Sequence, residues 1–237
     1  MADLWHPIGG VYISDLGDKQ YLFQFFNEVD VQRVISGTPW FFNGHLLVLQ
    51  RIKKGEIPSM LVLSYTEFWI QVHDLPAGMM SELMCKKLGE FLGKFLEYDV
   101  SSLALGHSSY MHICVRLDVT APLKRKKKIQ MRDNSPVYVH FKYEKLSMFC
   151  FICGKLRHGE SFCPFRLKIE PSKISYRWDL SLRAVTRRQN TGVSRWLREA
   201  DELHYCTVNM GSVSQSNSFN WENDSRGNQG AILGIRR

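Results

Sequence analysis

No apolar run in the 237-residue sequence approaches the ~18 residues that a membrane-spanning helix requires. The first ten residues, MADLWHPIGG, also lack the basic-then-apolar order of a secretory signal. We therefore expect a protein that is not secreted and does not associate with membranes. In such a protein, the scattered cysteines Cys85, Cys114 and Cys206 are expected to be reduced thiols and not parts of a disulfide framework.

Sequence motifs of the common enzyme classes are missing as well. There is no glycine-rich phosphate loop, no GxSxG nucleophile elbow, no HExxH, and no cluster of carboxylates spaced for two-metal chemistry. We therefore expect neither an enzyme nor a small-molecule substrate.

Acidic residues are outnumbered mainly in the second half of the chain. Residues 1–110 hold 8 Lys and Arg against 12 Asp and Glu, whereas residues 111–237 hold 23 against 11. The formal net charge of +8 therefore comes from the second half alone. Such asymmetry suggests a scaffold followed by a region that meets a polyanion, although a basic surface can also serve solubility only.

Half of the cysteines lie in one fourteen-residue stretch, CFICGKLRHGESFC. Its C-x2-C-x4-H-x4-C spacing makes Cys150, Cys153, His158 and Cys163 candidate metal ligands. Three thiolates and one imidazole suit tetrahedral Zn²⁺, and four protein ligands leave no position for a water. The pattern therefore predicts one structural zinc, held in a zinc knuckle that is too short to fold without its metal.

This stretch resembles the short retroviral-type knuckle that binds single-stranded nucleic acid. Its context, FKYEKLSMFCFICGKLRHGESFC, resembles a plant module in which domain-of-unknown-function family 4283 precedes a knuckle of the same spacing in retrotransposon-like proteins. Further similar stretches are YLFQFFNEVDVQRVISGTPWFFNGHLLVLQR, FWIQVHDLP, DVTAPLKRKKKI, RWDLSLRA and SRWLRE. The resemblance implies a protein of retroelement ancestry that binds zinc and nucleic acid and has no assigned enzymatic activity.

The resemblance also suggests which knuckle residues contact nucleic acid. Phe151 occupies the place of an aromatic platform on which an unpaired base stacks. Lys155, Arg157 and Arg166 would contact phosphates around it. Arg157, however, stands where the family usually has glycine.

A second departure concerns the other platform position, two residues after the histidine, which holds Glu160 in place of an apolar residue. Phe162 could substitute for that platform. Packing against the preceding domain is the alternative role for Phe149, Phe151 and Phe162. Zinc binding is therefore a firmer prediction than base stacking.

Some twenty residues before the knuckle lies a run of five cations, Lys124, Arg125, Lys126, Lys127 and Lys128. Because adjacent cations repel one another, we expect a loop there and not a buried element. The run could neutralise phosphates and make binding strongly salt-dependent, act as a nuclear import signal, or remain solvated without a partner. Its position favours a nucleic-acid track shared with the knuckle, and a nuclear location slightly over a cytoplasmic one.

The first segment, residues 1–66, predicts strands and one helix. GVYISDL and YLFQFF are expected to be strands joined by a turn at Gly17-Asp18-Lys19. NEVDVQRVISG predicts a helix that stops at Gly37, and HLLVLQRI predicts a third strand after a turn at Asn43-Gly44.

Residues 67–145 predict a related unit with the basic loop inside it. FWIQVHDLP, FLEYDV, MHICVRLDV and VYVHFKYE are expected to be strands. SELMCKKLGEFLGK predicts a helix with Ser81 as N-cap and an apolar stripe of Leu83, Leu88, Phe91 and Leu92. The whole predicts an α+β fold of antiparallel sheets with helices packed on one face. RNA-recognition-motif folds enter their helix similarly, but MHICVRLDV lacks the paired aromatics that stack bases there.

Three segments follow this unit: the knuckle at 146–166, a basic and aromatic extension at 167–206, and a tail at 207–237. In the extension, Tyr176, Trp178 and Trp196 alternate with cations, which suits either contact with a single strand or docking on the body of the protein. The tail contains 14 Ser, Asn and Gly among its 31 residues, which predicts disorder.

Two functions remain in competition. The favoured one is binding of single-stranded RNA or DNA with low sequence specificity, in which cations contact phosphates and one or two aromatics stack on bases. The alternative is a protein-interaction or self-assembly module, in which the zinc only fixes a loop and the N-terminal region self-associates. Nucleic-acid binding should weaken steeply with salt, whereas an apolar interface should change little.

Overall fold

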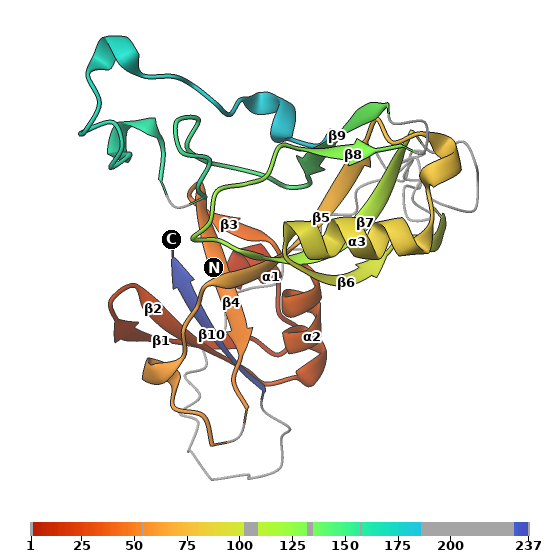
Figure 1. Ribbon diagram of the computed structural model, residues 1–237. Coiled ribbons are helices and arrows are strands. Elements are labelled where there is room, and N and C mark those ends of the chain that lie inside the picture. The colour runs from red at the N-terminus through yellow and green to blue at the C-terminus, as the bar shows by residue number, and fades with distance from the viewer. Residues whose placement is uncertain are drawn as a thin grey trace, which may run out of the picture. The chain divides into compact units, whose positions relative to one another are not determined.

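A computed structural model describes residues 2–53, 55–101, 109–131, 135–156, 158–185 and 230–236 (Figure 1). The strands form two antiparallel five-stranded sheets, as the α+β prediction anticipated. The first sheet has the order β1-β2-β10-β4-β3 and consists of β1 (Val11–Gly17), β2 (Gln20–Phe25), β10 (Gly230–Arg236), β4 (His45–Arg51) and β3 (Trp40–Phe42). The second has the order β6-β7-β5-β9-β8 and consists of β6 (Lys94–Tyr98), β7 (Tyr110–Asp118), β5 (Tyr65–His73), β9 (Pro136–Tyr143) and β8 (Lys126–Gln130).

The helices are short, and each of the two longer ones packs on one sheet. The α-helices are α1 (Ala2–Trp5), α2 (Glu28–Ser36) and α3 (Glu82–Leu92). Single 3₁₀ turns are η1 (Pro58–Met60), η2 (Ala77–Met79), η3 (Glu160–Phe162), η4 (Pro171–Lys173) and η5 (Leu180–Leu182). In the described part of the chain, no helix is long and apolar enough to cross a membrane.

The first sheet follows the predicted order of elements closely. The turn at Asn43-Gly44 has positive φ at both residues, 49° and 76°, as a tight hairpin requires. Helix α2 buries Val31 and Val34 against a core that includes Phe23 of β2. The segment Trp40–Phe42 is itself a strand, β3, which the sequence did not predict.

The C-terminal strand β10 corrects the prediction of a disordered tail over residues 207–237. Residues 230–236 lie between β2 and β4 and pair antiparallel with both (Figure 1). Ile232 is fully buried in the core of the first sheet. The sequence did not predict this strand because the short, mainly apolar run AILGIR lies in a tail of mostly polar composition. The rest of the predicted tail lies outside the described residues.

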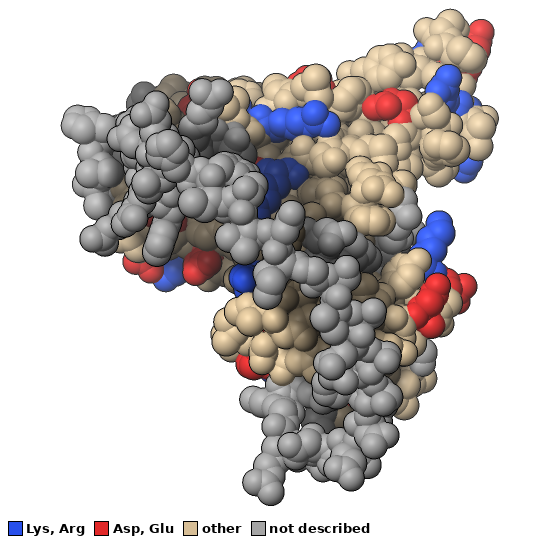
Figure 2. Space-filling view, turned by 180° about the vertical axis from the view of Figure 1, so that it is seen from behind, with Lys and Arg blue, Asp and Glu red and all other residues tan. Residues whose placement is uncertain are grey.

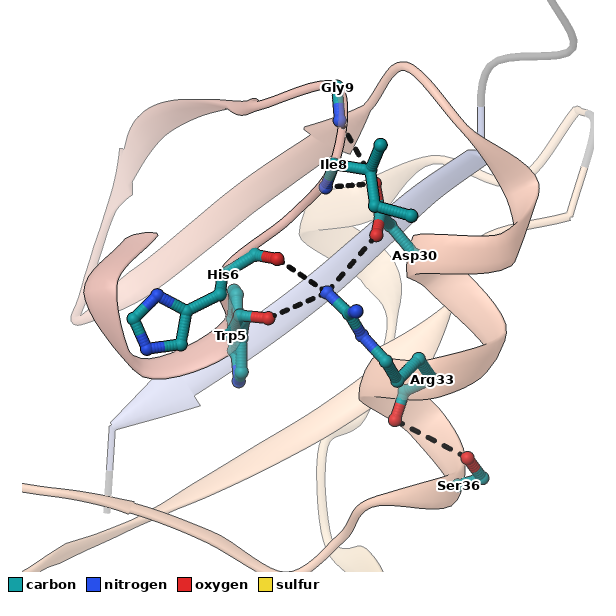
Figure 3. A network of polar contacts seen from close by, with 7 residues as sticks. All are labelled: Trp5, His6, Ile8, Gly9, Asp30, Arg33 and Ser36. Atoms are coloured by element: carbon teal, nitrogen blue, oxygen red, sulfur yellow. Dashed lines mark hydrogen bonds and ion pairs between the residues drawn. The ribbon is translucent and has the colours of Figure 1, made fainter. Parts of the chain in front are cut away.

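A buried carboxylate joins the N-terminal segment to α2 (Figure 3). Asp30 is fully buried, and its Oδ2 accepts hydrogen bonds from the backbone N–H of Ile8 at 2.9 Å and of Gly9 at 3.3 Å. The guanidinium of Arg33 lies 3.2 Å from Asp30 Oδ1 and also donates to the carbonyls of Trp5 and His6. Asp30 and Arg33 therefore fix the segment that precedes β1 against helix α2 through hydrogen bonds.

Replacing this carboxylate should destabilise the first sheet. Asp30→Ala leaves the N–H groups of Ile8 and Gly9 without their acceptor and removes the ion pair with Arg33, so we expect a loss of about 3 kcal/mol in the free energy of unfolding. Urea denaturation measures this loss, with Glu97→Ala at an exposed position as the matched control. A loss below about 1 kcal/mol would show that water replaces these contacts.

The second sheet is covered on one face by α3. The predicted N-cap is confirmed, because Ser81 Oγ accepts from the Met84 N–H at 3.3 Å. The predicted apolar stripe is wrong at Leu83, which is exposed. The buried side of the helix passes through Cys85 and Leu88, since residues spaced by three and four share one helix face.

The basic loop predicted between two strands is also corrected. Residues 126–130 of the segment form strand β8, which lies at the edge of the second sheet and, within the described residues, pairs with β9 alone. Lys126 and Lys128 are exposed, whereas Lys127 is half-buried on the side of α3. Repulsion among the cations excludes a buried element but not an edge strand, and lysines are common on edges because they discourage pairing with other chains.

Candidate metal centre

The four predicted ligands converge in the structure. One donor atom from each of Cys150, Cys153, His158 and Cys163 lies within 4.8 Å of every other. The three cysteines are buried and form no disulfide, and the Cys153 Sγ lies 3.3 Å from the His158 Nε2. The knuckle is therefore arranged around a common centre.

The donor set fits one zinc ion. A tetrahedron with Zn–S bonds of about 2.3 Å has edges of about 3.8 Å, so atoms within 4.8 Å of one another need only small shifts to close around it. Three thiolates and an imidazole are the donors that structural zinc sites use. Cys150, Cys153, His158 and Cys163 are thus positioned to bind one metal ion, consistent with one structural zinc.

Backbone N–H groups surround the sulfur atoms and favour their charged form. Burial raises the pKa of the Cys150 thiol to about 12, although the N–H groups of Cys153 and Ile152 act against it. Burial would also raise the pKa of Cys163, but the N–H groups of Arg166 and Phe165, with the other two cysteines, hold it below its usual value. Metal binding must therefore displace protons from buried thiols, and the backbone is placed to stabilise the thiolates that result.

The loop turns at Gly154, whose φ of +74° favours glycine. Its N–H donates to the Cys150 carbonyl at 2.7 Å, and the Cys150 N–H donates to the Lys155 carbonyl at 3.0 Å. A Cβ at Gly154 would lie 2.3 Å from the Trp178 ring. Glycine is therefore required both by the turn and by the close approach of Trp178.

Trp178 links the knuckle by hydrogen bonds to the segment that leads into β8. Its backbone N–H donates to the Phe151 carbonyl at 3.1 Å, and its indole N–H donates to the Leu123 carbonyl at 2.8 Å. The Leu123 N–H in turn donates to the Gly154 carbonyl at 2.9 Å. For Trp178, the structure therefore shows docking on the body, one of the two roles that the sequence left open.

Trp178→Ala should loosen this docking without removing a zinc ligand. Loss of the ring and its hydrogen bond is expected to lower the free energy of unfolding by about 3 kcal/mol, while zinc stoichiometry stays the same. Urea denaturation and metal analysis of one preparation measure both quantities. Tyr176→Ala, at an exposed ring two residues earlier, is the control and should behave like the unmodified protein.

The predicted nucleic-acid contacts in the knuckle differ in exposure. Phe151 is half-buried, with its ring centre 4.9 Å from that of buried Phe149. Lys155 is half-buried and Arg166 is exposed, while Arg157 lies outside the described residues. Phe149 therefore packs in the core, which is the alternative role that the sequence offered. Phe151 packs against Phe149, but part of its ring remains accessible to solvent.

Phe162 is the most exposed aromatic side chain of the knuckle, at 82%. It lies in η3, one residue before the last cysteine ligand. Glu160, at the predicted second platform, instead accepts a hydrogen bond from the Phe151 N–H at 3.1 Å. The exposure of the Phe162 ring excludes the packing role for this residue, and the platform role that the sequence offered for it stays a prediction.

The structure brings the basic run next to the knuckle, because Leu123 directly precedes Lys124 and bonds to Gly154. Several cations of the run lie over aromatic rings. Lys127 Nζ is 4.0 Å from the Phe91 ring centre, Lys126 Nζ is 4.9 Å from that of Tyr138, and Arg125 lies 5.8 Å from that of Trp178. Lys124 donates to the Phe91 carbonyl.

On the face of the molecule seen in Figure 2, charge alone does not outline an interface. On the face shown in Figure 2, the described Lys and Arg side chains are interspersed with Asp and Glu. The proximity of particular cations to aromatic rings and to the knuckle is therefore more informative than the net charge of +8.

Comparison with known proteins confirms the expected modules. Residues 1–59 match the family described as Domain of unknown function (DUF4283), and residues 117–165 match the family described as Zinc knuckle. An uncharacterized protein of Arabidopsis thaliana is 24% identical over 143 residues, which are 60% of this chain and 45% of that protein. The matched region thus spans less than half of the relative's length. No solved structure matches the chain.

Proposed function

We propose that this chain, in which a DUF4283 segment precedes a zinc knuckle, binds single-stranded RNA or DNA with low sequence specificity. The cluster of three cysteines and one histidine makes the knuckle a zinc module of the nucleic-acid-binding type. The observation that supports the proposal most is the hydrogen bond between Leu123 and Gly154, which sets Lys124–Lys128 beside the knuckle.

Each part of this surface has a distinct role in the proposal. Exposed cations, among them Arg166 and Lys128, neutralise phosphates, which contributes affinity without reading sequence. The exposed ring of Phe162, together with the accessible part of Phe151, stacks on unpaired bases. Bound zinc supplies no reactive position, since all four of its ligands come from the protein, and the chain acts as a binding protein and not as an enzyme.

Phe162→Ala should weaken binding about tenfold while zinc content stays constant, because one stacked ring contributes ~1–3 kcal/mol. Fluorescence polarisation with labelled single-stranded RNA and DNA measures this change, and the affinity ratio identifies the preferred strand. Phe26→Ala, which removes an exposed ring directly after β2, is the control. Equal affinities of Phe162→Ala and the unmodified protein would reject the stacking role.

A salt series tests the cationic part separately. If about five cations contact phosphates of a single strand, the logarithm of affinity should fall with the logarithm of salt concentration at a slope of about −3.5. Replacing the three lysines Lys126, Lys127 and Lys128 by alanine should reduce that slope. No binding even at low salt would reject the proposed function.

The second candidate function is self-association through the first sheet. Strand β1 is an edge strand, and it exposes Tyr12, Ile13 and Leu16. Apolar side chains on an unpaired edge favour pairing with another chain. Salt-independent dimers in light scattering, combined with absent nucleic-acid binding, would favour this function.

The resemblance to plant retrotransposon-like proteins further supports retroelement ancestry for the proposed binding protein, and the basic run supports a nuclear over a cytoplasmic location. Fluorescence microscopy of the tagged chain with and without Lys126, Lys127 and Lys128 tests the location. Unchanged distribution after their removal would reject the import role.

A further inference from the structure

The face of the second sheet opposite α3 carries aromatic and basic side chains in cross-strand rows. Alternate residues of β5 and β7, such as Ile70, Val72, Met111 and Ile113, are buried in the core with α3. Because side chains alternate along a strand, the residues between them point to the other face. That face, called here the open face, is defined by Trp69, His73, Tyr110, His112, Tyr138, His140, Lys142, Lys126 and Lys128.

One row crosses four adjacent strands in register. Tyr110 of β7 pairs with His73 of β5, His73 pairs with His140 of β9, and His140 pairs with Lys126 of β8. Three rings are thus followed by a cation at the edge of the sheet. Neighbouring strands are about 4.8 Å apart, so the row is long enough to meet more than one nucleotide.

The rings of the open face lie close together, and their planes are tilted against one another. The Tyr110 and His73 ring centres are 5.0 Å apart with an interplanar angle of 33°. Trp69 and His112 are 4.4 Å apart at 30°. Tyr138 adds a ring that is 46% exposed. Flat rings gathered on a sheet surface provide stacking partners for unpaired bases, whatever the sequence of bases.

Two acidic side chains beside this face are paired with its polar side chains, while exposed lysines add positive charge at the edge of the sheet. Glu144 accepts from Gln71 Nε2 at 2.7 Å and lies 3.1 Å from His112 Nε2. Asp74 Oδ2 lies 2.7 Å from His140 Nδ1. Lys126 and Lys128 are exposed on the same face, and Lys126 lies over the Tyr138 ring at 4.9 Å.

A cavity of about 320 Å³ opens at the end of the row. Its lining includes Arg125, Lys126, His140 and Lys142, together with Asp74. The three cations Arg125, Lys126 and Lys142 outnumber the two carboxylates of the lining, Asp74 and Asp179, which suits a phosphate group. Rings for bases and cations for phosphates therefore occur side by side.

The open face and the knuckle are joined through one short segment. Arg125, which lines the cavity, lies 5.8 Å from the ring centre of Trp178, the residue that docks the knuckle. Leu123, at the start of this segment, is hydrogen-bonded to Gly154 of the knuckle, and Lys126, at its end, belongs to the edge strand β8 of the open face.

We infer that the open face is a second binding surface for unpaired single-stranded nucleic acid, continuous with the knuckle. Bases stack on Tyr110, His73 and Tyr138, and phosphates contact Lys126 and Lys128. The inference rests on the proposed function and extends it, because the knuckle alone would hold only a few nucleotides. The sequence alone did not predict a base-stacking surface on this sheet.

Variants of exposed residues test the inference in the full zinc-loaded chain with a labelled 20-nucleotide single strand. Tyr138→Ala and the double variant Lys126→Ala/Lys128→Ala should each lower affinity about fivefold or more. Phe26→Ala, which removes an exposed ring directly after β2, is the control and should leave affinity unchanged. Circular dichroism of all variants establishes that the fold is retained.

Ultraviolet crosslinking followed by mass spectrometry of the unmodified protein gives a readout that needs no mutation. Crosslinked peptides from β5, β7 or β9 support the inference. If the unmodified protein binds but crosslinks come only from residues 149–169, and Tyr138→Ala binds normally, the inference is overturned and the proposed function stands. If the unmodified protein does not bind at all, both are overturned.

Discussion

Cys153→Ser is expected to yield a chain with almost no bound zinc under conditions in which the unmodified protein retains about one zinc per chain. The substitution removes a thiolate from a closed set of four donors that lie within 4.8 Å of one another. Zinc binding contributes about 10–16 kcal/mol in comparable peptides, so loss of one ligand removes a large share of what holds the knuckle together. Metal analysis after dialysis against a weak chelator measures the stoichiometry.

The matched control is Cys85→Ala, which removes a buried cysteine outside the cluster. It should retain one zinc. One zinc per chain in Cys153→Ser, or loss of zinc in both variants, would reject the ligand assignment.

Loss of zinc should affect the knuckle more than the sheets. Phe149 and Leu156 belong to the core of the second sheet, and Trp178 adds hydrogen bonds that do not depend on the metal. We therefore expect Cys153→Ser to keep the far-ultraviolet circular dichroism of the sheets. Limited proteolysis should cut it more rapidly within residues 150–169. Cleavage spread evenly over the chain would instead indicate that the zinc supports the whole fold.

The metal site was predictable because its residues lie close together in sequence. A spacing of two and four residues between ligands brings them around one ion almost regardless of the surrounding fold. The first sheet was predictable for a similar reason, since the Asn43-Gly44 turn and the apolar periodicity around Val31 and Val34 are local signals.

Tertiary contacts account for what the sequence did not show. Trp178 lies fifteen residues beyond the last ligand, and nothing in its neighbourhood specifies that its indole reaches the Leu123 carbonyl. The Phe162 ring is exposed and the Phe149 ring is buried, although the two residues look equivalent in sequence.

The aromatic residues of the open face could have been predicted from the alternation of apolar core residues with aromatic residues along each strand. Extending the predicted strand MHICVRLDV by one residue adds Tyr110, which alternates with buried Met111 as His112 alternates with Ile113. Trp69 and His73 alternate with Ile70 and Val72 in the same way. Which of these residues lie opposite each other, however, depends on register between strands far apart in the chain.

Deleting residues 230–237 should destabilise the first sheet severely, because β10 is its central strand. Its removal exposes the hydrogen-bonding edges of β2 and β4, which are otherwise paired through it. It also removes Ile232, which is fully buried against Phe23 and neighbouring core residues. Unpaired edges of this kind promote aggregation. We expect the shortened chain to lose the cooperative unfolding of the first sheet and to be poorly soluble.

A point substitution makes the same test without shortening the chain. Ile232→Ala should lower the free energy of unfolding by about 3 kcal/mol, since it creates a cavity in a closed core. Val185→Ala, at an exposed position, should change it by less than 0.5 kcal/mol. Hydrogen exchange should show faster exchange in β2 and β4 for Ile232→Ala, while β5 and β7 remain protected. Equal stability of the two variants would show that β10 is not part of the first sheet in solution. Residues 1–59 would then have to form that sheet without its central strand.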